Sequence, residues 1–254
     1  MQSDSKPRIL VTGMSGLIGT ALYNTHRDHY HWRALNRRST VHGVETVLAD
    51  IADLEAIRPA FEDVQTVVHL AADIRIDAPW EVIHPNNIVG TYNVFEAARQ
   101  AGVRRIIFAS SGSVMAGVQR EEPYKAIAEG RYTDVPERWP MFDHTSTVRP
   151  VGLYGVSKVF GEVLARHYVD TTPLSIICLR IGWVGERPKE PPHFANWCST
   201  RDAVQMIERC IQAPPELRYD IFFVTSENRW SYRDLTHARE VVGFVPLDRA
   251  EDHR

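Results

Sequence analysis

A tyrosine and a lysine four residues apart carry the clearest chemical signal in this chain. Tyr154 and Lys158 lie in the stretch Tyr-Gly-Val-Ser-Lys, and on a helix a spacing of four places both side chains on one face. A free phenol has a pKa of about 10, too high for a base at neutral pH, but a nearby ammonium group favours the phenolate. We therefore expect Lys158 to lower the pKa of Tyr154, which would then exchange a proton with an alcohol or a carbonyl group.

Serine hydroxyls at the end of an apolar run supply a partner for this pair. Residues 105–109 indicate a buried strand and are followed by Ser-Ser-Gly-Ser at 110–113. In parallel α/β sheets, ligands bind beyond the carboxyl ends of the strands. We expect Ser111 to orient the substrate oxygen, and Gly112 and Ser113 to contact the substrate. The alternative is that these serines serve only a turn.

A glycine-rich stretch follows the first predicted strand. Residues 8–12 are mostly apolar, Thr-Gly-Met-Ser-Gly-Leu-Ile-Gly occupies 12–19, and a helix is expected at 17–27. Glycines at every third position permit a tight turn, a close approach of backbone amides to a pyrophosphate and close helix–sheet packing. The helix N-terminus then attracts the phosphates; a plain strand-to-helix turn is the alternative. The cofactor contacts predicted here are Gly13, Ser15, Gly16, Leu17, Ile18 and Gly19.

The end of the second predicted strand, at 32–36, should select the cofactor. An acidic residue there would hold the ribose 2′-hydroxyl of NAD, but this chain has Asn36, Arg37 and Arg38. Guanidinium groups suit a 2′-phosphate, so the pattern favours NADP over NAD. Solvated surface arginines are the alternative.

Further cofactor contacts are expected where other strands end. Small residues after the fourth strand would let the chain pass close to the cofactor, and residues 50–51 would flank the adenine. Asn87 is a candidate catalytic residue, expected to hold a backbone group or a water in a proton relay, and Asn86 is expected to cap a helix. The predicted cofactor contacts of this second group are Asp50, Ile51, Leu70, Ala71, Ala72, Asn87, Tyr154, Lys158 and Ile181.

Alternating strands and helices must position these residues. Runs of about five apolar residues fit buried parallel strands, and their alternation with helices fits βαβ units with right-handed crossovers. We therefore predict an α/β fold with a Rossmann-type doubly wound parallel sheet. Strands are predicted at 8–12, 32–36, 44–49, 66–70, 105–109, 174–181 and 220–225. Helices are predicted at 17–27, 53–61, 79–101, 151–168, 200–212 and 231–242.

Two regions are expected to serve the substrate within a single domain of residues 1–254. Residues 117–150 contain four prolines and many charges without a clear period, and an irregular segment of this length is usually functional. We predict a substrate loop there, with an insertion of no function as the alternative. Residues 182–254, which include a proline-rich loop at 187–192, are expected to form a small region that covers the substrate.

Composition limits the partners of the chain. Its 254 residues are 44% hydrophobic and 24% charged, as in ordinary globular enzymes. A net charge of −3 argues against nucleic acid or anionic lipid as a partner, and no apolar run approaches the roughly 20 residues that span a bilayer. Residues 1–8 are polar and lack a secretory signal, which favours the cytoplasm. The three cysteines show no zinc-ligand spacing, so no metal is expected.

Together these motifs resemble the extended short-chain dehydrogenases/reductases over nearly the whole chain. The family's glycine pattern matches residues 13–19, its serine matches Ser111, and its tyrosine–lysine pair matches Tyr154 and Lys158. The resemblance implies an oxidoreductase that moves a hydride between NAD or NADP and a small hydroxyl- or carbonyl-bearing substrate.

Two branches of that family are most similar. Residues 149–158 look much like uronate dehydrogenases, and residues 78–80 and 238–243 are similar to archaeal NAD-dependent glucose-6-phosphate dehydrogenases. The resemblance implies oxidation of an aldose, sugar phosphate or uronate at its anomeric carbon to a lactone. It also implies a possible homodimer built on the helices at 79–101 and 151–168.

The chain departs from these relatives at its predicted pocket. They usually have Asn-His after the catalytic serine, where this chain has Gly112 and Ser113, and an acidic residue where it has Asn36. Arg180 matches an arginine that holds the carboxylate in uronate dehydrogenases, so the resemblance implies a substrate contact. An ion pair inside the fold is the alternative for Arg180.

Two other functions use the same motifs. A nucleotide-sugar epimerase or dehydratase would keep its cofactor tightly bound through a cycle without net redox change, but such enzymes are generally longer, and only about 70 residues follow the strand at 174–181. A non-catalytic NADP-sensing protein would often lose the tyrosine or the lysine, whereas this chain retains Tyr154 and Lys158.

Overall fold

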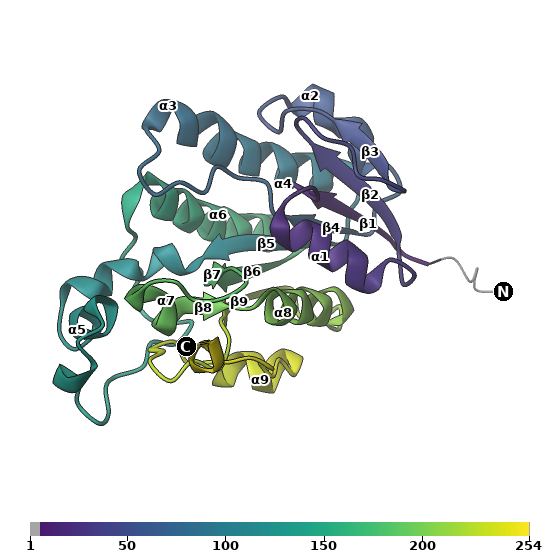
Figure 1. The fold of residues 1–254 in the computed structure, drawn as a ribbon. Coiled ribbons are helices and arrows are strands. Elements are labelled where there is room, and N and C mark those ends of the chain that lie inside the picture. The colour runs from purple at the N-terminus through teal and green to yellow at the C-terminus, as the bar shows by residue number, and fades with distance from the viewer. Residues whose placement is uncertain (1–5, 254) are drawn as a thin grey trace.

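A seven-stranded parallel sheet forms the centre of the molecule (Figure 1). The computed structural model describes residues 6–253, so the polar residues 1–5 behind the cytoplasmic expectation lie outside it. The strand order is β3-β2-β1-β4-β5-β6-β9, and every neighbouring pair is parallel. The strands are β1 (Arg8–Thr12), β2 (His31–Asn36), β3 (Glu45–Leu48), β4 (Thr66–His69), β5 (Arg105–Ser111), β6 (Ser175–Ile181) and β9 (Tyr219–Val224). The predicted doubly wound fold is confirmed.

Helices cover both faces of the sheet, and a core lies on each side. The helices α4 and α6 lie on one face and α1 and α8 on the other (Figure 1). The strands of this sheet are apolar on both faces because both are covered. The helices are α1 (Leu17–His26), α2 (Leu54–Ile57), α3 (Trp80–Ile83), α4 (Gly90–Gln100), α5 (Tyr124–Glu129), α6 (Gly152–Thr171), α7 (Pro191–Asn196), α8 (Thr200–Gln212) and α9 (Thr236–Val242).

The helix predicted at 79–101 is interrupted. The chain forms α3, then a π-helical turn at His84–Val89, and then α4. Pro85 has no N–H group to donate within a helix, and its ring crowds the preceding turn. The N–H of Gly90 accordingly bonds to the carbonyl of Pro85, five residues back, which is the spacing of a π turn.

The helix predicted at 231–242 begins only at Thr236. Residues before it pair with a distant segment instead, because the N–H of Phe142 bonds to the carbonyl of Tyr232 and the N–H of Asp234 bonds to that of Phe142. This long-range pairing outweighs the local helical pattern and buries Tyr232 and Arg233.

The two regions predicted to serve the substrate, the loop at 117–150 and the small region at 182–254, both contain regular structure. Residues 117–150 include α5 and short 3-10 turns, and the proline-rich loop leads into α7, whose first turn accommodates proline. Beyond β6, the chain adds β9 to the main sheet and packs α8 against α1. Two further short strands, β7 (Trp183–Val184) and β8 (Trp197–Cys198), pair in parallel with each other.

Candidate active site

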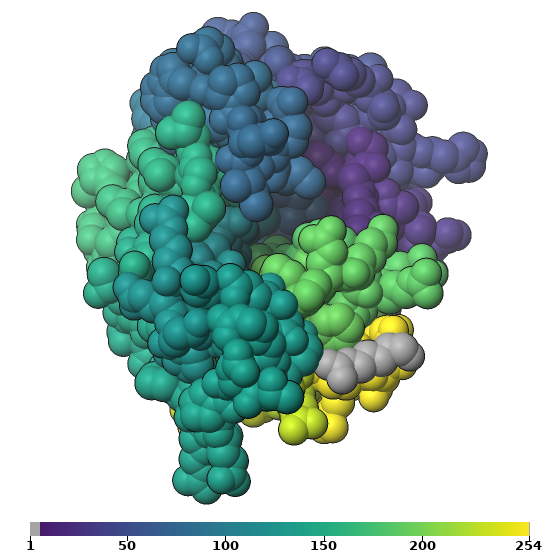
Figure 2. Space-filling model, turned by 60° about the vertical axis from the view of Figure 1, so that its left-hand side comes forward, coloured from purple at the N-terminus to yellow at the C-terminus, as the bar shows by residue number. Residues whose placement is uncertain are grey.

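A cleft of about 750 Å³ lies at the carboxyl ends of the strands β1, β2, β4, β5 and β6. Figure 2 shows the molecule hollowed between its blue, teal and green segments. This is where ligands bind in doubly wound sheets. Most predicted site residues line it, namely Gly13, Ser15, Gly16, Leu17, Ile18, Gly19, Asn36, Arg37, Arg38, Asp50, Ile51, Leu70, Ala71, Ala72, Ser111, Ser113, Tyr154, Lys158 and Ile181.

The glycines of this stretch bring bare backbone to one end of the cleft. Gly13 has a φ of 72°, and a Cβ there would lie 3.1 Å from the Cα of Ala71. A Cβ at Gly19 would lie 2.6 Å from the Cα of Met14, closer than real atoms pack. The N-cap residue of α1, Gly16, makes no side-chain capping bond. The N-terminal N–H groups of α1 therefore suit an anion such as a pyrophosphate.

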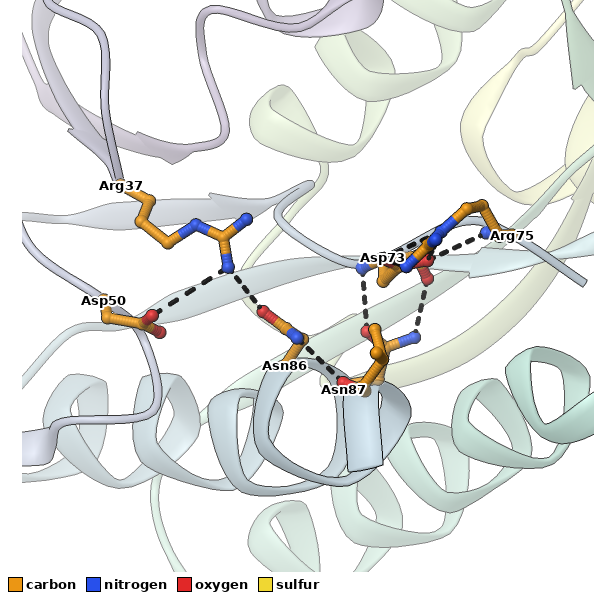
Figure 3. Close-up of polar contacts among 7 residues, drawn as sticks. Arg37, Asp50, Asp73, Arg75, Asn86 and Asn87 are labelled. Atoms are coloured by element: carbon orange, nitrogen blue, oxygen red, sulfur yellow. Dashed lines mark hydrogen bonds and ion pairs between the residues drawn. The ribbon is translucent and has the colours of Figure 1, made fainter. Parts of the chain in front are cut away.

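The end of β2 is organised by hydrogen bonds. Asn36 is buried, and its Nδ2 donates to the carbonyl of Ser39 at 2.7 Å. Arg37 lies across the cleft rim, where its Nη1 donates to Oδ1 of Asn86 at 2.9 Å and lies 3.9 Å from Oδ2 of Asp50 (Figure 3). Arg38 is exposed. No acidic side chain takes the position of Asn36, and this end of the cleft presents Arg38 together with Arg37, which is paired with Asp50.

Tyr154 and Lys158 meet at the other end of the cleft. Lys158 Nζ donates to the carbonyl of Ala109 at 2.7 Å and lies 5.6 Å from the centre of the Tyr154 ring. Burial lowers the pKa of Lys158 to about 8. Burial also raises the pKa of Tyr154, while a hydrogen bond with Ser111 acts in the opposite direction. The net pKa of Tyr154 is therefore raised, where the sequence predicted a lowered value, because desolvation disfavours the phenolate.

Ser111 lies beside Tyr154 at the end of β5. Its Oγ accepts a hydrogen bond from the N–H of Ser113 at 3.1 Å, which starts a 3-10 turn at Gly112–Val114. The hydroxyl is also near enough to Tyr154 to act on the pKa of the phenol. Two hydroxyl groups thus converge on one place in the cleft, where they can bind the same substrate oxygen.

Asn87 is a positioning residue and does not line the cleft. Its Oδ1 accepts from the N–H of Asp73 at 2.8 Å, and its Nδ2 donates to the carbonyl of Asp73 at 2.9 Å (Figure 3). The same Nδ2 donates to Oγ of Ser157 at 3.1 Å. The prediction of a backbone contact is met, but every polar atom of Asn87 is engaged within the protein. Asn87 thus ties the segment after β4 to the helix that carries Tyr154, and its expected cofactor contact and catalytic role stay predictions.

Arg180 and Gly112 also lie outside the cleft lining. Arg180 is 2% exposed and forms a two-fold hydrogen-bonded ion pair with Glu162, at 2.9 Å and 2.8 Å. The alternative reading, an ion pair inside the fold, describes it, because a buried guanidinium needs a countercharge. A Cβ on Gly112 would lie 2.8 Å from Oδ1 of Asn196, so the space beside this residue is already taken.

Several cleft residues escaped the sequence prediction. Those that directly follow predicted strands could have been found by the rule for strand ends, whereas Asn86 was expected to cap a helix but lies inside the π turn, and Asn196 comes from the distant α7. They are Leu35, Ser39, Ala49, Asp73, Ile74, Ile76, Asn86, Ala109, Ser110, Gly182, Trp183, Val184 and Asn196.

Residues 117–150 contribute nothing to the lining of this cleft. Part of them, with residues 226–239, lines a separate hollow of about 430 Å³. Their role in substrate binding stays a prediction. Over residues 6–253, no helix has both the length and the apolar character needed to cross a bilayer.

Known proteins resemble this chain over nearly all of its length. Residues 9–245 match the sequence profile of the NAD dependent epimerase/dehydratase family. An NAD-dependent glucose-6-phosphate dehydrogenase of Haloferax volcanii is 35% identical over 96% of this chain and 94% of its own, and an L-arabinose 1-dehydrogenase (NAD(P)(+)) of the same organism is 34% identical over 96% and 97%. A uronate dehydrogenase variant of Agrobacterium tumefaciens, solved in complex with NAD, superposes with a TM-score of 0.83 at 30% identity, covering 98% of this chain and 87% of that one.

Proposed function

Because this chain belongs to the NAD dependent epimerase/dehydratase family and is an NAD(P)-dependent dehydrogenase, we propose that it oxidises the anomeric hydroxyl of an aldose, sugar phosphate or uronate. One observation carries the proposal. Ser111, Tyr154 and Lys158 lie at one end of a continuous cleft whose other end is the glycine stretch. A sugar at the first end and a dinucleotide along the cleft would bring their reacting carbons together.

The residues present fit a nicotinamide dinucleotide. The backbone of residues 13–19 would hold the pyrophosphate, residues 36–38 the adenosine ribose, and Lys158 the nicotinamide ribose. When bound, the cofactor supplies the carbon that accepts or donates the hydride.

Tyr154 carries the proton in this mechanism. Burial raises its pKa, so the phenol holds its proton at neutral pH and can give it to a carbonyl oxygen; proton removal from an alcohol becomes easier as the pH rises. Ser111, which lines the cleft with that phenol, holds the reacting oxygen. Lys158 stabilises the phenolate that forms when the proton leaves.

The preferred cofactor in this proposal is NADP. A carboxylate at the end of β2 would repel a 2′-phosphate, and Asn36 replaces it. The exposed guanidinium of Arg38 and the rim guanidinium of Arg37 both face the cleft, and arginine suits phosphate oxygens.

We also propose that the protein is a homodimer through α3, α4 and α6. Large apolar side chains on these helices are exposed by more than a third, and such patches favour protein contacts. They are Trp80, Tyr92, Leu153, Val156 and Val163. Light scattering should give twice the chain mass, and Val163→Glu should lower it, whereas Leu247→Glu, which changes an exposed residue elsewhere, should not.

The direct test is cofactor reduction, followed by absorbance, with NAD and NADP in parallel. The panel holds glucose, arabinose, glucose 6-phosphate, glucuronate and galacturonate. We expect net reduction with at least one of these sugars. Cofactor binding without net reduction on the whole panel would contradict the proposal and lead to tests for epimerase or dehydratase activity on nucleotide sugars.

A further inference from the structure

Arg233 is a buried cation without a countercharge. Arg233 is 2% exposed, and neither its Nε nor its Nη2 has a hydrogen-bond partner. Its remaining contacts are a 3.4 Å bond from Nη1 to the carbonyl of Ala195 and the ring of Tyr232, 4.6 Å from its guanidinium carbon. Among residues 6–253, no carboxylate forms an ion pair with Arg233. Because arginine stays charged and is rarely buried unpaired, this guanidinium has unused capacity to bind an anion.

The free face of Arg233 lies beside the catalytic serine. A Cβ built on Gly112, the residue after Ser111, would be 3.4 Å from Nη2 of Arg233. Gly112 has no side chain, so the guanidinium reaches this position from the segment that leads into α9. Because Ser111 and Gly112 are adjacent at the end of β5, the guanidinium of Arg233 lies near the segment that carries the catalytic hydroxyl.

A second unused polar group adjoins the same place. Oδ1 of Asn196 is buried, has no hydrogen-bond partner and lies 2.8 Å from the same built Cβ of Gly112. Asn196 also lines the main cleft, whereas Arg233 lines the separate hollow of about 430 Å³. An amide side chain can donate as well as accept hydrogen bonds, and it connects the guanidinium to the space that the substrate would enter.

The nearby carboxylate of Asp234 does not neutralise this cation. Its Oδ1 accepts the N–H of Thr236 at the start of α9. Arg180 gives the contrast, because its buried guanidinium is paired with Glu162. Arg180 Nη1 is also without a hydrogen-bond partner, so the difference between these two buried arginines is that Arg180 has a carboxylate partner and Arg233 has none among residues 6–253.

We propose that Arg233 and Asn196 form a subsite for an anionic substituent of the substrate, a carboxylate or a phosphate. This inference rests on the proposed function and adds that acidic aldoses are preferred over neutral ones. The planar guanidinium offers two parallel N–H donors to two anionic oxygens, and Oδ1 of Asn196 would accept a hydrogen bond from an adjacent hydroxyl of the substrate.

The first test needs no variant. The ratio of kcat/KM for glucuronate over glucose, and for glucose 6-phosphate over glucose, measures what the anionic group contributes. We expect one ratio to exceed 10, and which one does so distinguishes carboxylate from phosphate. If both ratios stay near 1 while glucose is oxidised, the inference fails and the proposed function stands. If no sugar reduces the cofactor, both fail.

The second test removes the charge. Arg233→Met should raise KM for the preferred acidic sugar about 10- to 100-fold, as expected for a lost hydrogen bond to a charged group. It should leave KM for glucose and the cofactor Kd unchanged. Arg233→Lys keeps the charge without the fork and should restore part of the loss, and it carries the test if the methionine variant does not fold. Arg239→Met, at an exposed ion pair with Glu227, is the matched control.

An equal rise of KM for acidic and neutral sugars in Arg233→Met would overturn the subsite, because it would show a structural role alone. An unchanged KM for the acidic sugar would overturn it as well.

Discussion

The two ends of the cleft are built differently. Glycine backbone forms the predicted pyrophosphate site at the cofactor end, whereas side chains from distant segments meet at the substrate end. Residues 13–19 form the cofactor end with a backbone that admits no Cβ at Gly13 or Gly19. At the substrate end, Ser111 from β5, Tyr154 from α6 and Asn196 from α7 converge.

This difference explains what each end can vary. A pyrophosphate is the same in every dinucleotide, so a fixed backbone cradle suits it. The substrate end must distinguish sugars, and side chains such as Asn196 and Arg233 can be exchanged without disturbing a strand. The following changes test that contrast, from the largest expected effect to the smallest.

Tyr154→Phe should lower kcat about a thousandfold, since general acid–base groups contribute about 10²- to 10⁴-fold. The cofactor Kd, measured by fluorescence titration, should stay the same, because the change removes only the hydroxyl at the substrate end. Tyr23→Phe, beside Trp32 and remote from the cleft lining, is the control. Turnover at the level of the unchanged protein would refute the role of Tyr154.

Arg180→Met should lower the free energy of unfolding by about 3 kcal/mol, because it leaves Glu162 buried without its partner. Urea denaturation measures this. Arg166→Met, at an exposed pair with Asp170, should cost less than about 1 kcal/mol. If Arg180→Met instead kept its stability and raised KM for uronates alone, Arg180 would belong to the substrate end after all.

Lys158→Met should make the protein more stable at pH 7 than the unchanged chain, by about 1 to 3 kcal/mol. Burial lowers the pKa of Lys158 to about 8, against about 10.4 for an unfolded lysine. The folded state therefore binds fewer protons between these values, and the cost of charging Lys158 is complete below pH 8 and fades as the pH rises toward 10.4.

The difference between Lys158→Met and the unchanged protein should accordingly shrink by pH 10 in denaturant unfolding. Lys125→Met, at an exposed position, should show no such trend. A constant difference at both pH values would mean that Lys158 does not titrate in this range.

Asn36→Asp with Arg37→Ser should shift the ratio of kcat/KM for NAD over NADP upward about tenfold. The new carboxylate can hold a ribose 2′-hydroxyl and repels a 2′-phosphate. Steady-state kinetics with both cofactors measure the ratio, and Arg58→Ser, on the exposed turn after α2, is the control. An unchanged ratio would remove the argument for NADP from the end of β2.

Local patterns predicted the cofactor end closely. The strand, glycine stretch and helix at residues 8–26 follow one another without a gap in the structure as in the sequence, because glycine periodicity and apolar runs act over a few residues. The tyrosine–lysine spacing likewise placed both residues on α6 and in the cleft. The interruption at Pro85 could have been predicted, because proline disrupts a helix interior. The prediction of one helix at 79–101 followed the amphipathic pattern instead.

Only the tertiary structure decided which polar residues are satisfied within the protein. The sequence does not show how Arg180 and Arg233 are paired. In the structure, Arg180 forms an ion pair with Glu162 across a helix–sheet contact, whereas Arg233 forms no ion pair within residues 6–253. The pKa of Tyr154 is raised because burial outweighs its neighbours, and burial depends on contacts between segments that are far apart in the chain. The sequence thus determined the fold, the glycine cradle and the catalytic pair, whereas charge pairing and desolvation were set by packing.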